Sequence, residues 1–296
     1  MSDTPSSPAP ASLPPDPQLR KPKRALPPGT IDCHAHIFDR FDQYPLAGQR
    51  KYNPPLCSRE AWFALHEALG IARGVQVHGS PYGFDNSITL DFVKAYPQRL
   101  RAVAAISPDV TDEELKRLTA GGFRAARLMD QFATGATTKD LEAIANKIAP
   151  YDWHIEINIA KSADWVDLEP RLRKCPVPVV FDHLGRPRGA EGIDAPGFKV
   201  IRRLLVEGDK FWTKVSSWYR LSDSGAPGYA DMKPFVQAVL TDRPDRCVFG
   251  TNWPHPGIRN HMPNDADLVD QLESWLPDEA VRLPLFVTNA EKLYRF

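Results

Sequence analysis

Eight short apolar runs, separated by amphipathic stretches, constrain the fold of this chain most. The runs are β-branched or apolar on both faces, which is typical of buried parallel strands. We predict strands at Ile31 to His36, Arg73 to Val77, Leu100 to Ile106, Arg124 to Met129, His154 to Ile159, Val177 to Asp182, Phe211 to Val215 and Arg246 to Gly250. Between them the clearest predicted helices are Glu60 to Leu69, Asn86 to Ala95, Thr111 to Ala120, Thr138 to Ile148 and Ala230 to Leu240.

This alternation predicts an α/β protein with a (β/α)8 TIM barrel. The number of repeats and the length of the chain after Gly29 fit that fold, which typically takes about 250 residues. A doubly wound open sheet would usually carry a glycine-rich phosphate-binding turn after its first strand, and the sequence after His36 has none. In a barrel, the chemistry is expected at the carboxyl ends of the strands.

The first 29 residues differ in composition from the rest of the chain. They contain nine prolines, many small polar residues and a basic run at Lys21, Lys23 and Arg24. Such a segment buries too little apolar surface to offset its ordering entropy. We therefore predict a disordered proline-rich arm over residues 1–29 and one barrel domain over residues 30–296, and we interpret the basic run as a solvated charge cluster.

Bulk composition excludes several classes of partner. The formal net charge is zero, which gives no electrostatic reason to expect nucleic acid or an anionic membrane. No apolar run approaches the roughly 20 residues that a membrane span needs. The four cysteines are scattered without a CxxC pair, which favours free thiols in a reducing compartment, so we expect a cytoplasmic protein. The oligomeric state is not predicted.

A histidine pair closes the first predicted strand, in Thr30 to His36. Because side chains alternate along a strand, we expect Asp32, His34 and His36 to share one face. A third histidine, His183, follows the sixth strand. Three neutral imidazoles suit zinc, and a protonated cluster that polarises a carbonyl is the other interpretation.

Further polar residues follow the other strands, where a barrel brings them to one mouth. They are His78 and Ser80, Asp130, Asn158, Arg220 and Asn252. His154 begins its strand, at the opposite end of the barrel, so we interpret it as structural.

Three motifs resemble the amidohydrolase superfamily, and more narrowly its lactonase branch. They are the His34–His36 pair, the sequence DHLGRP at Asp182 to Pro187, and GTNWPHP at Gly250 to Pro256. The branch includes 2-pyrone-4,6-dicarboxylate lactonases, 4-sulfomuconolactone hydrolases and galactarolactone isomerases. The resemblance extends from residue 30 to residue 296, and Gln76 to Asn86, Gly121 to Met129 and Val287 to Asn289 also match.

We predict roles for ten residues, most of which the resemblance implies. It implies catalytic roles for His34, His36, His183 and Asn252, and we add His255 as a possible base on the same loop. The residues expected to bind substrate are Tyr52, Ser80, Arg127, Asn158 and Arg220. Arginine suits a carboxylate because two parallel N–H donors meet two oxygens.

Two departures from the superfamily pattern affect the expected chemistry. Binuclear members carry a carbamylated lysine at the end of the fourth strand, where this chain has Met129 and Asp130, so we expect no binuclear site. The hydrolases of the branch use an aspartate base where this chain has Asn252, and an amide cannot take up a proton near neutral pH. His183, His255, Asp39, Asp42 or Asp130 would have to replace that base.

We therefore predict a hydrolase of a small carboxylated lactone similar to 2-pyrone-4,6-dicarboxylate, without metal or other cofactor. One alternative is a lactone isomerase of the galactarolactone type, whose pattern shares the asparagine. Another is a mononuclear zinc amidohydrolase or decarboxylase, with zinc at His34, His36 and His183. A non-catalytic barrel that binds a carboxylated ligand is the third alternative.

Overall fold

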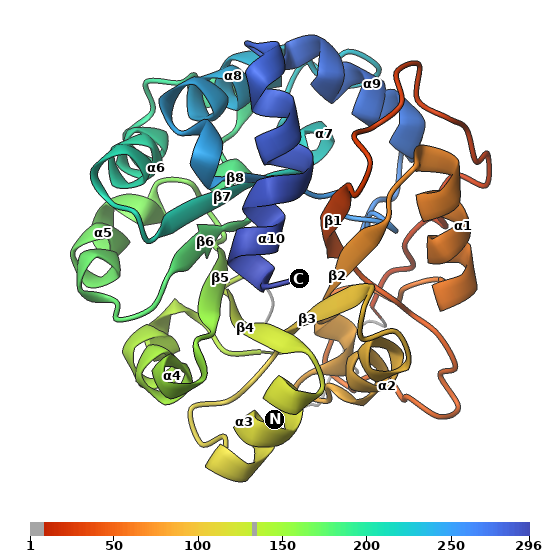
Figure 1. The fold of residues 1–296 in the computed structure, drawn as a ribbon, viewed down its shortest axis with the longest axis vertical. Helices are drawn as coiled ribbons and strands as arrows, with labels where there is room; N and C mark the ends of the chain where they lie inside the picture. Colours follow the sequence, from red (N-terminus) through yellow and green to blue (C-terminus); the bar gives the residue numbers. More distant parts are fainter. Residues whose placement is uncertain (1–8, 132–134) are drawn as a thin grey trace, which may run out of the picture.

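Eight parallel strands form a barrel in this computed structural model, which describes residues 9–131 and 135–296 (Figure 1). Each strand pairs with the next along the chain, so the sheet order is β1 to β8. The predicted barrel is confirmed, with β1 (Ile31–Ala35), β2 (Arg73–Val77), β3 (Leu100–Ala104), β4 (Phe123–Met129), β5 (His154–Asn158), β6 (Val179–Phe181), β7 (Phe211–Val215) and β8 (Cys247–Phe249).

Helices cover the outside of the barrel, and the five predicted ones are present (Figure 1). Among the described residues, no helix combines the length and apolar character that a membrane crossing requires. The helices are α1 (Arg59–Leu69), α2 (Ser87–Ala95), α3 (Asp112–Ala120), α4 (Leu141–Ile148), α5 (Asp164–Lys174), α6 (Pro196–Glu207), α7 (Trp218–Leu221), α8 (Lys233–Asp242), α9 (Asp265–Trp275) and α10 (Asn289–Tyr294).

The barrel closes where the segment after β8 meets β1. The backbone N–H of Asn252 donates to the His34 carbonyl at 2.7 Å, and that of His36 donates to the Trp253 carbonyl at 2.8 Å. Gly250 permits this approach, because a Cβ atom there would lie 2.8 Å from the Cβ of His34. Closure therefore places the ends of β1 and β8, which carry His36 and Asn252, next to each other.

The inside of the barrel is filled by two layers of different character. The layer farther from the carboxyl ends of the strands is apolar and is completed by α10. Its members include Ile31, Val75, Val103, Trp212 and Tyr294. Above it, alternate positions of β4 to β7 point charged side chains inward. These are Arg127, Glu156, Asp182 and Lys214, all buried. The charged layer is the floor beneath the carboxyl ends of the strands.

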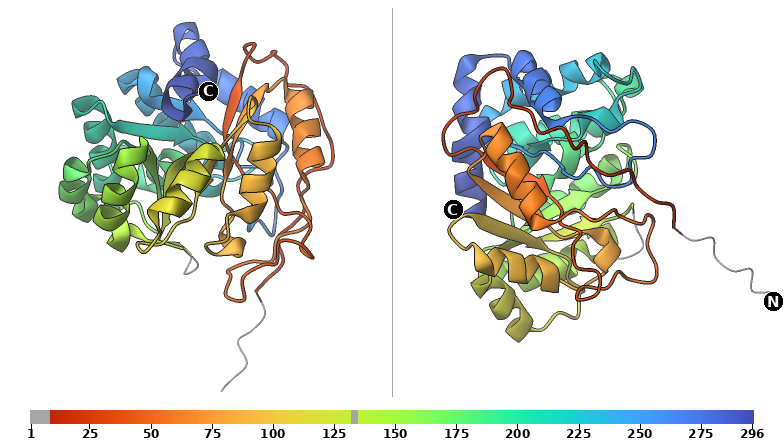
Figure 2. Two further views of the ribbon diagram at one scale, coloured as in Figure 1. Left: turned by 60° about the horizontal axis from the view of Figure 1, so that its bottom comes forward. Right: turned by 90° about the vertical axis from the view of Figure 1, so that its right-hand side faces the viewer.

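The N-terminal segment departs from the prediction of a disordered arm. Residues 9–29 lie in extended conformation against the barrel (Figure 2). Arg20 and Arg24 pair with Asp267 of α9 and with Glu279, respectively. Burial of Leu26 adds apolar contact. Ion pairs and backbone hydrogen bonds hold this proline-rich segment, and such long-range contacts cannot be predicted from its composition. Residues 1–8 lie outside the described residues.

The start of this segment joins two loops at the mouth of the barrel. Ser12 N–H donates to the Asn53 carbonyl at 2.9 Å, in the loop after β1. Leu13 N–H donates to the Ile258 carbonyl at 2.8 Å, in the loop after β8. The Ser12 hydroxyl also accepts from Gly257 N–H at 2.9 Å. Residues 9–13 therefore form a clip between the loops that carry Tyr52 and Asn252.

Deleting residues 1–18 is expected to lower the melting temperature by about 2 to 6 °C, because each lost hydrogen bond contributes about 1 kcal/mol net and part of that is returned as chain entropy. Differential scanning calorimetry measures the change. Deleting only residues 1–8 is the matched control, since it keeps the contacts of Ser12 and Leu13. Equal melting temperatures for both deletions would contradict a stabilising clip.

Candidate active site

A cavity opens at the carboxyl ends of the strands, with about 390 Å³ of empty space that includes its opening to solvent. It brings together eight of the ten residues named from the sequence, and their roles remain predictions. His34 and His255 are buried outside its lining. The lining residues are His36, Tyr52, Ser80, Arg127, Met129, Gln131, Asn158, His183, Arg186, Arg220, Asn252 and Pro256.

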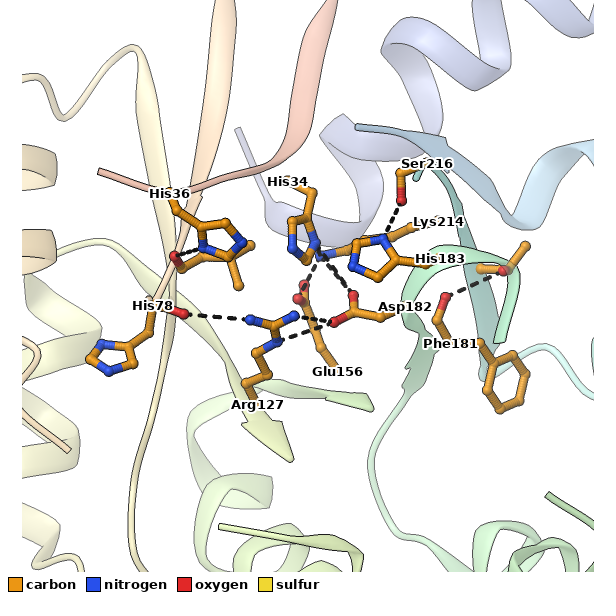
Figure 3. A network of polar contacts seen from close by, with 12 residues as sticks. His34, His36, His78, Arg127, Glu156, Phe181, Asp182, His183, Lys214 and Ser216 are labelled. Atoms are coloured by element: carbon orange, nitrogen blue, oxygen red, sulfur yellow. Dashed lines mark hydrogen bonds and ion pairs between the residues drawn. The ribbon is translucent and has the colours of Figure 1, made fainter. Parts of the chain in front are cut away.

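The three predicted histidines form one cluster, shown in Figure 3. The ring centroid of His34 lies 5.0 Å from that of His36 and 4.6 Å from that of His183. His36 and His183 face the cavity, and His34 is fully buried beside them. The cluster therefore presents two imidazoles to a ligand and holds the third within the protein.

Asp32 does not join this cluster, so the prediction that it shares a face with His34 is wrong. The register between β1 and β2 shifts between Asp32 and Ala35, which breaks the simple alternation of side chains. Asp32 instead accepts from the Thr251 hydroxyl at 2.7 Å and lies 3.4 Å from His66 Nε2 of α1. Its role is to anchor the turn after β8.

Hydrogen bonds fix the tautomers of two histidines. His36 Nδ1 lies 2.9 Å from the Val77 carbonyl, which can only accept, so His36 carries its proton on Nδ1 and a lone pair on Nε2. His34 Nδ1 lies 3.0 Å from the Lys214 ammonium, which can only donate, so the His34 proton is on Nε2. That Nε2–H has no hydrogen-bond partner among the described residues.

All three imidazoles of the cluster are held neutral. Burial, together with Arg127, lowers the pKa of His36 to about 3. Burial also places the pKa values of His34 and His183 well below their usual range, with Lys214 adding to the shift at His34 and Arg127 at His183. The structure thus favours neutral hydrogen-bonding groups over the protonated cluster that the sequence left open.

Lys214 is the centre of a buried charge network beside His34 and His183 (Figure 3). Its ammonium lies 2.5 Å from Glu156 Oε2 and 3.3 Å from Asp182 Oδ1. Burial alone would raise the pKa of both carboxyls, but Lys214 brings each below its usual value. Sequence reasoning missed both Lys214 and Glu156, although a charged residue inside an otherwise apolar strand was a usable signal.

The partners of Glu156 extend the network toward the base of the barrel. The Tyr294 hydroxyl of α10 donates to Glu156 Oε1 at 2.6 Å. His154 Nε2 lies 3.4 Å from the same oxygen, in agreement with the structural role expected for this histidine. The floor of the site is therefore tied to the helix that closes the opposite end of the barrel.

A divalent metal ion does not fit this cluster. Among the described residues, one group of metal-type ligands is close enough, His34, Asp182 and His183, with ligand atoms within 4.8 Å of one another. The Lys214 ammonium already contacts two of these ligand atoms, His34 Nδ1 at 3.0 Å and Asp182 Oδ1 at 3.3 Å, which are themselves 3.4 Å apart. Zinc also needs an imidazole lone pair, and that of His34 accepts from Lys214. The same contact argues against His34 as a ligand in the zinc site considered at His34, His36 and His183.

Three arginines line the cavity, and they differ in their partners. Arg127 Nη2 lies 3.0 Å from Asp182 Oδ2, so its charge is compensated. Arg220 Nε donates to the Tyr219 hydroxyl at 3.3 Å, and its Nη2 donates to the Pro256 carbonyl. Arg186 was not named from the sequence. Burial and the neighbouring Arg220 lower its pKa to about 10, which leaves it charged at neutral pH.

Neutral polar groups complete the wall of the cavity. Ser80 hydrogen-bonds to Tyr52, and burial raises the pKa of that phenol to about 12, so it stays protonated. Asn158, at the end of β5, has a buried Oδ1 without a hydrogen-bond partner among the described residues. These groups can donate to, or accept from, the oxygens of a polar ligand.

The carboxylates proposed as a replacement base lie elsewhere. Asp130 caps the next turn by accepting from Thr138 N–H and its hydroxyl, each at 2.8 Å. Asp39 accepts from Arg40 N–H at 2.8 Å, and Asp42 is exposed. None of the three lines the cavity among the described residues. Loop position alone did not reveal that their side chains turn away.

Asn252 lines the cavity and is backed by a chain of buried groups. Its Nδ2 donates to the Tyr219 hydroxyl at 2.9 Å. That hydroxyl lies 2.7 Å from His255 Nδ1, and His255 Nε2 lies 3.2 Å from Asp265 Oδ2. Burial alone would lower the pKa of His255, but Tyr219 and Asp265 raise it to about 9. Both ring nitrogens of His255 are engaged by these contacts and its side chain is screened from the cavity, which argues against its expected role as a base.

Comparison with known proteins gives the relationship of the chain. The amidohydrolase family model matches residues 31–296. A 2-pyrone-4,6-dicarboxylate hydrolase from Comamonas testosteroni is 34% identical over 93% of this chain and 92% of its own length. A D-galactarolactone isomerase from Agrobacterium fabrum is 31% identical over 93% of this chain and 94% of its own length. An apo structure from Agrobacterium tumefaciens has a TM-score of 0.84 and 31% identity, covering 93% of this chain and 98% of that one.

Replacing Lys214 with methionine is expected to lower the free energy of unfolding by about 3 to 5 kcal/mol, because Glu156 keeps a buried charge without its partner. Denaturant titration measures this change. The double variant Lys214→Met with Glu156→Gln removes both charges and should regain most of the stability. Wild-type stability in the single variant would mean that the ion pair contributes nothing.

Proposed function

The chain belongs to the amidohydrolase family, and we propose that it hydrolyses a lactone that carries two anionic groups. The lactone hydrolase and the lactone isomerase among its relatives, each aligned over most of this chain, support an ester bond in a ring as the target. We further propose that the reaction needs no metal and serves the catabolism of aromatic compounds or sugar acids. The four buried free cysteines agree with a cytoplasmic location.

The observation that carries this proposal is the charge of the cavity. Lys214 faces Glu156 and Arg127 faces Asp182, so these two cations are balanced by two carboxylates. Arg186 and Arg220 line the same cavity, and no carboxylate of the described residues pairs with either. Arg186 and Arg220 are partly buried, and charges withdrawn from water favour partners, which a substrate with two anionic groups would supply. A lactone with one carboxylate would balance only one of them.

The neutral histidines suit the polarisation of the lactone carbonyl. Ser216 Oγ lies 2.8 Å from His183 Nδ1, and when this hydroxyl donates, the His183 proton is on Nε2. Such an N–H group is a donor for the oxyanion that forms when the carbonyl is attacked. Removing one such donor typically costs about 10²- to 10³-fold in kcat.

We assign the nucleophile to a water molecule beside Asn252 and His36. The amide orients the water, and the lone pair on His36 Nε2 accepts its proton. The water oxygen bonds to the lactone carbon, the ring C–O bond breaks, and the proton passes to the leaving oxygen. Since Arg127 contributes to the low pKa of His36, an anion bound at the arginines would make this imidazole more basic.

Isomerisation is the second candidate, and Asn252 is the observation that favours it. In that reaction a hydroxyl of the substrate attacks its own ester and no external water is consumed. Incubation in 18O-labelled water distinguishes the two reactions. One labelled oxygen in the product supports hydrolysis, and conversion without label contradicts it.

Replacing Asn252 with aspartate is expected to raise hydrolysis about tenfold or more, because a carboxylate can act as general base on the water. The rate of lactone ring opening at neutral pH measures the effect. Asn260→Asp, on the exposed part of the same loop, is the matched control for an added charge. Loss of activity in Asn252→Asp would instead give the amide a positive catalytic role.

Replacing Arg186 with glutamine is expected to raise KM about 10- to 100-fold for a dianionic lactone, because one charge-assisted hydrogen bond is lost. The rise should be smaller for a lactone with one carboxylate. Arg259→Gln, an exposed arginine on the loop after β8, is the control. An unchanged KM in Arg186→Gln would refute the count of two uncompensated cations.

A further inference from the structure

The oxygen of Tyr219 is the meeting point of three polar groups. It lies 2.9 Å from Asn252 Nδ2, 3.3 Å from Arg220 Nε and 2.7 Å from His255 Nδ1. Two of these neighbours, Asn252 and Arg220, line the cavity, whereas His255 is fully buried. Tyr219 thus lies directly behind the wall of the site.

The hydrogen-bond capacity of this oxygen decides how the Asn252 amide is oriented. A phenol has one proton and accepts through its oxygen lone pairs. Arg220 can only donate, and the Tyr219 oxygen and His255 Nδ1, 2.7 Å apart, share one proton, which either atom can hold. What remains for Asn252 is a lone pair, which attracts an N–H group and repels a carbonyl oxygen. The amide must therefore turn Nδ2 toward Tyr219 and Oδ1 away from it.

The position of Tyr219 is itself fixed by a second buried contact. His255 Nε2 lies 3.2 Å from Asp265 Oδ2 at the start of α9. Burial alone would raise the pKa of Tyr219, but His255 and Arg220 bring it below its usual value. Asp265, His255 and Tyr219 form a line that ends at Asn252.

We propose that Tyr219, held by His255 and Asp265, is a positioning residue that keeps the Asn252 carbonyl oxygen facing the cavity as an acceptor for the O–H of the nucleophile. This inference rests on the proposed function for the identity of the nucleophile, a water or a hydroxyl group. An amide turned the other way would offer N–H to a group that must itself donate. Residue 252 would then hinder the attack that it is placed to assist.

A double-mutant cycle tests this role. Tyr219→Phe keeps the ring and removes the oxygen, so kcat is expected to fall about 10- to 100-fold, as for other losses of orientation, with KM changed less than about threefold. In the Asn252→Asp background the same change should cost less than about threefold, because a carboxylate has two equal oxygens and needs no orienting. Equal losses in both backgrounds would overturn the proposal.

A measurement without turnover separates this inference from the proposed function. The side-chain amide protons of Asn252, assigned by their absence in Asn252→Asp, are observed by NMR in 15N-labelled protein. Their exchange with solvent should be at least about tenfold slower in the wild type than in Tyr219→Phe. Equal exchange rates would overturn the positioning role, whether or not any lactone is turned over.

Tyr229→Phe is the matched control for both measurements. The ring of Tyr229 lies 6.4 Å from that of Tyr219, and both side chains are buried. Removing its hydroxyl leaves the contacts of Asn252 in place, so kcat and exchange should match the wild type. A loss equal to that of Tyr219→Phe would show a general packing effect and contradict the proposal.

Discussion

The contact between the Lys214 ammonium and the acceptors around it is the interaction on which the site depends. Buried in the barrel, this cation neutralises Glu156, lies beside Asp182 and donates to His34. It adds to the effect of burial that keeps His34 neutral, sets the proton of His34 on Nε2 and occupies the lone pair on Nδ1 that a metal ion would need. A barrel built to bind zinc requires lone pairs at this point; this one offers a fixed ammonium instead.

Above this charged layer, the site has one part whose charges are balanced within the protein and one part whose charges are not. The balanced part holds the histidines in one protonation state, and the unbalanced part, Arg186 and Arg220, is available to anions. Asn252 lies next to both, backed by Tyr219. The chemistry assigned to the cavity thus follows from where charge is compensated within the protein and where it is left for a ligand.

The repeat of apolar runs was enough to predict the barrel, because buried parallel strands have a distinctive composition. The HxH pair and strand-end polar residues likewise predicted most of the lining. Other features depend on geometry that no local pattern carries. A register shift separates Asp32 from the histidine cluster. Arg186, which lines the cavity, has a left-handed backbone with φ of 63°. Residues 9–29 contact the barrel through long-range ion pairs and backbone hydrogen bonds.

The clip formed by residues 9–13 has a consequence for how this barrel can diversify. It ties the loop after β1 to the loop after β8, and both loops contribute to the wall of the cavity. A loop of a barrel can usually be replaced without its neighbours. Here the clip and the loops after β1 and β8 are joined by backbone hydrogen bonds, although they are distant in sequence. Transferring the specificity of a relative to this barrel would therefore require replacing the clip and both loops together.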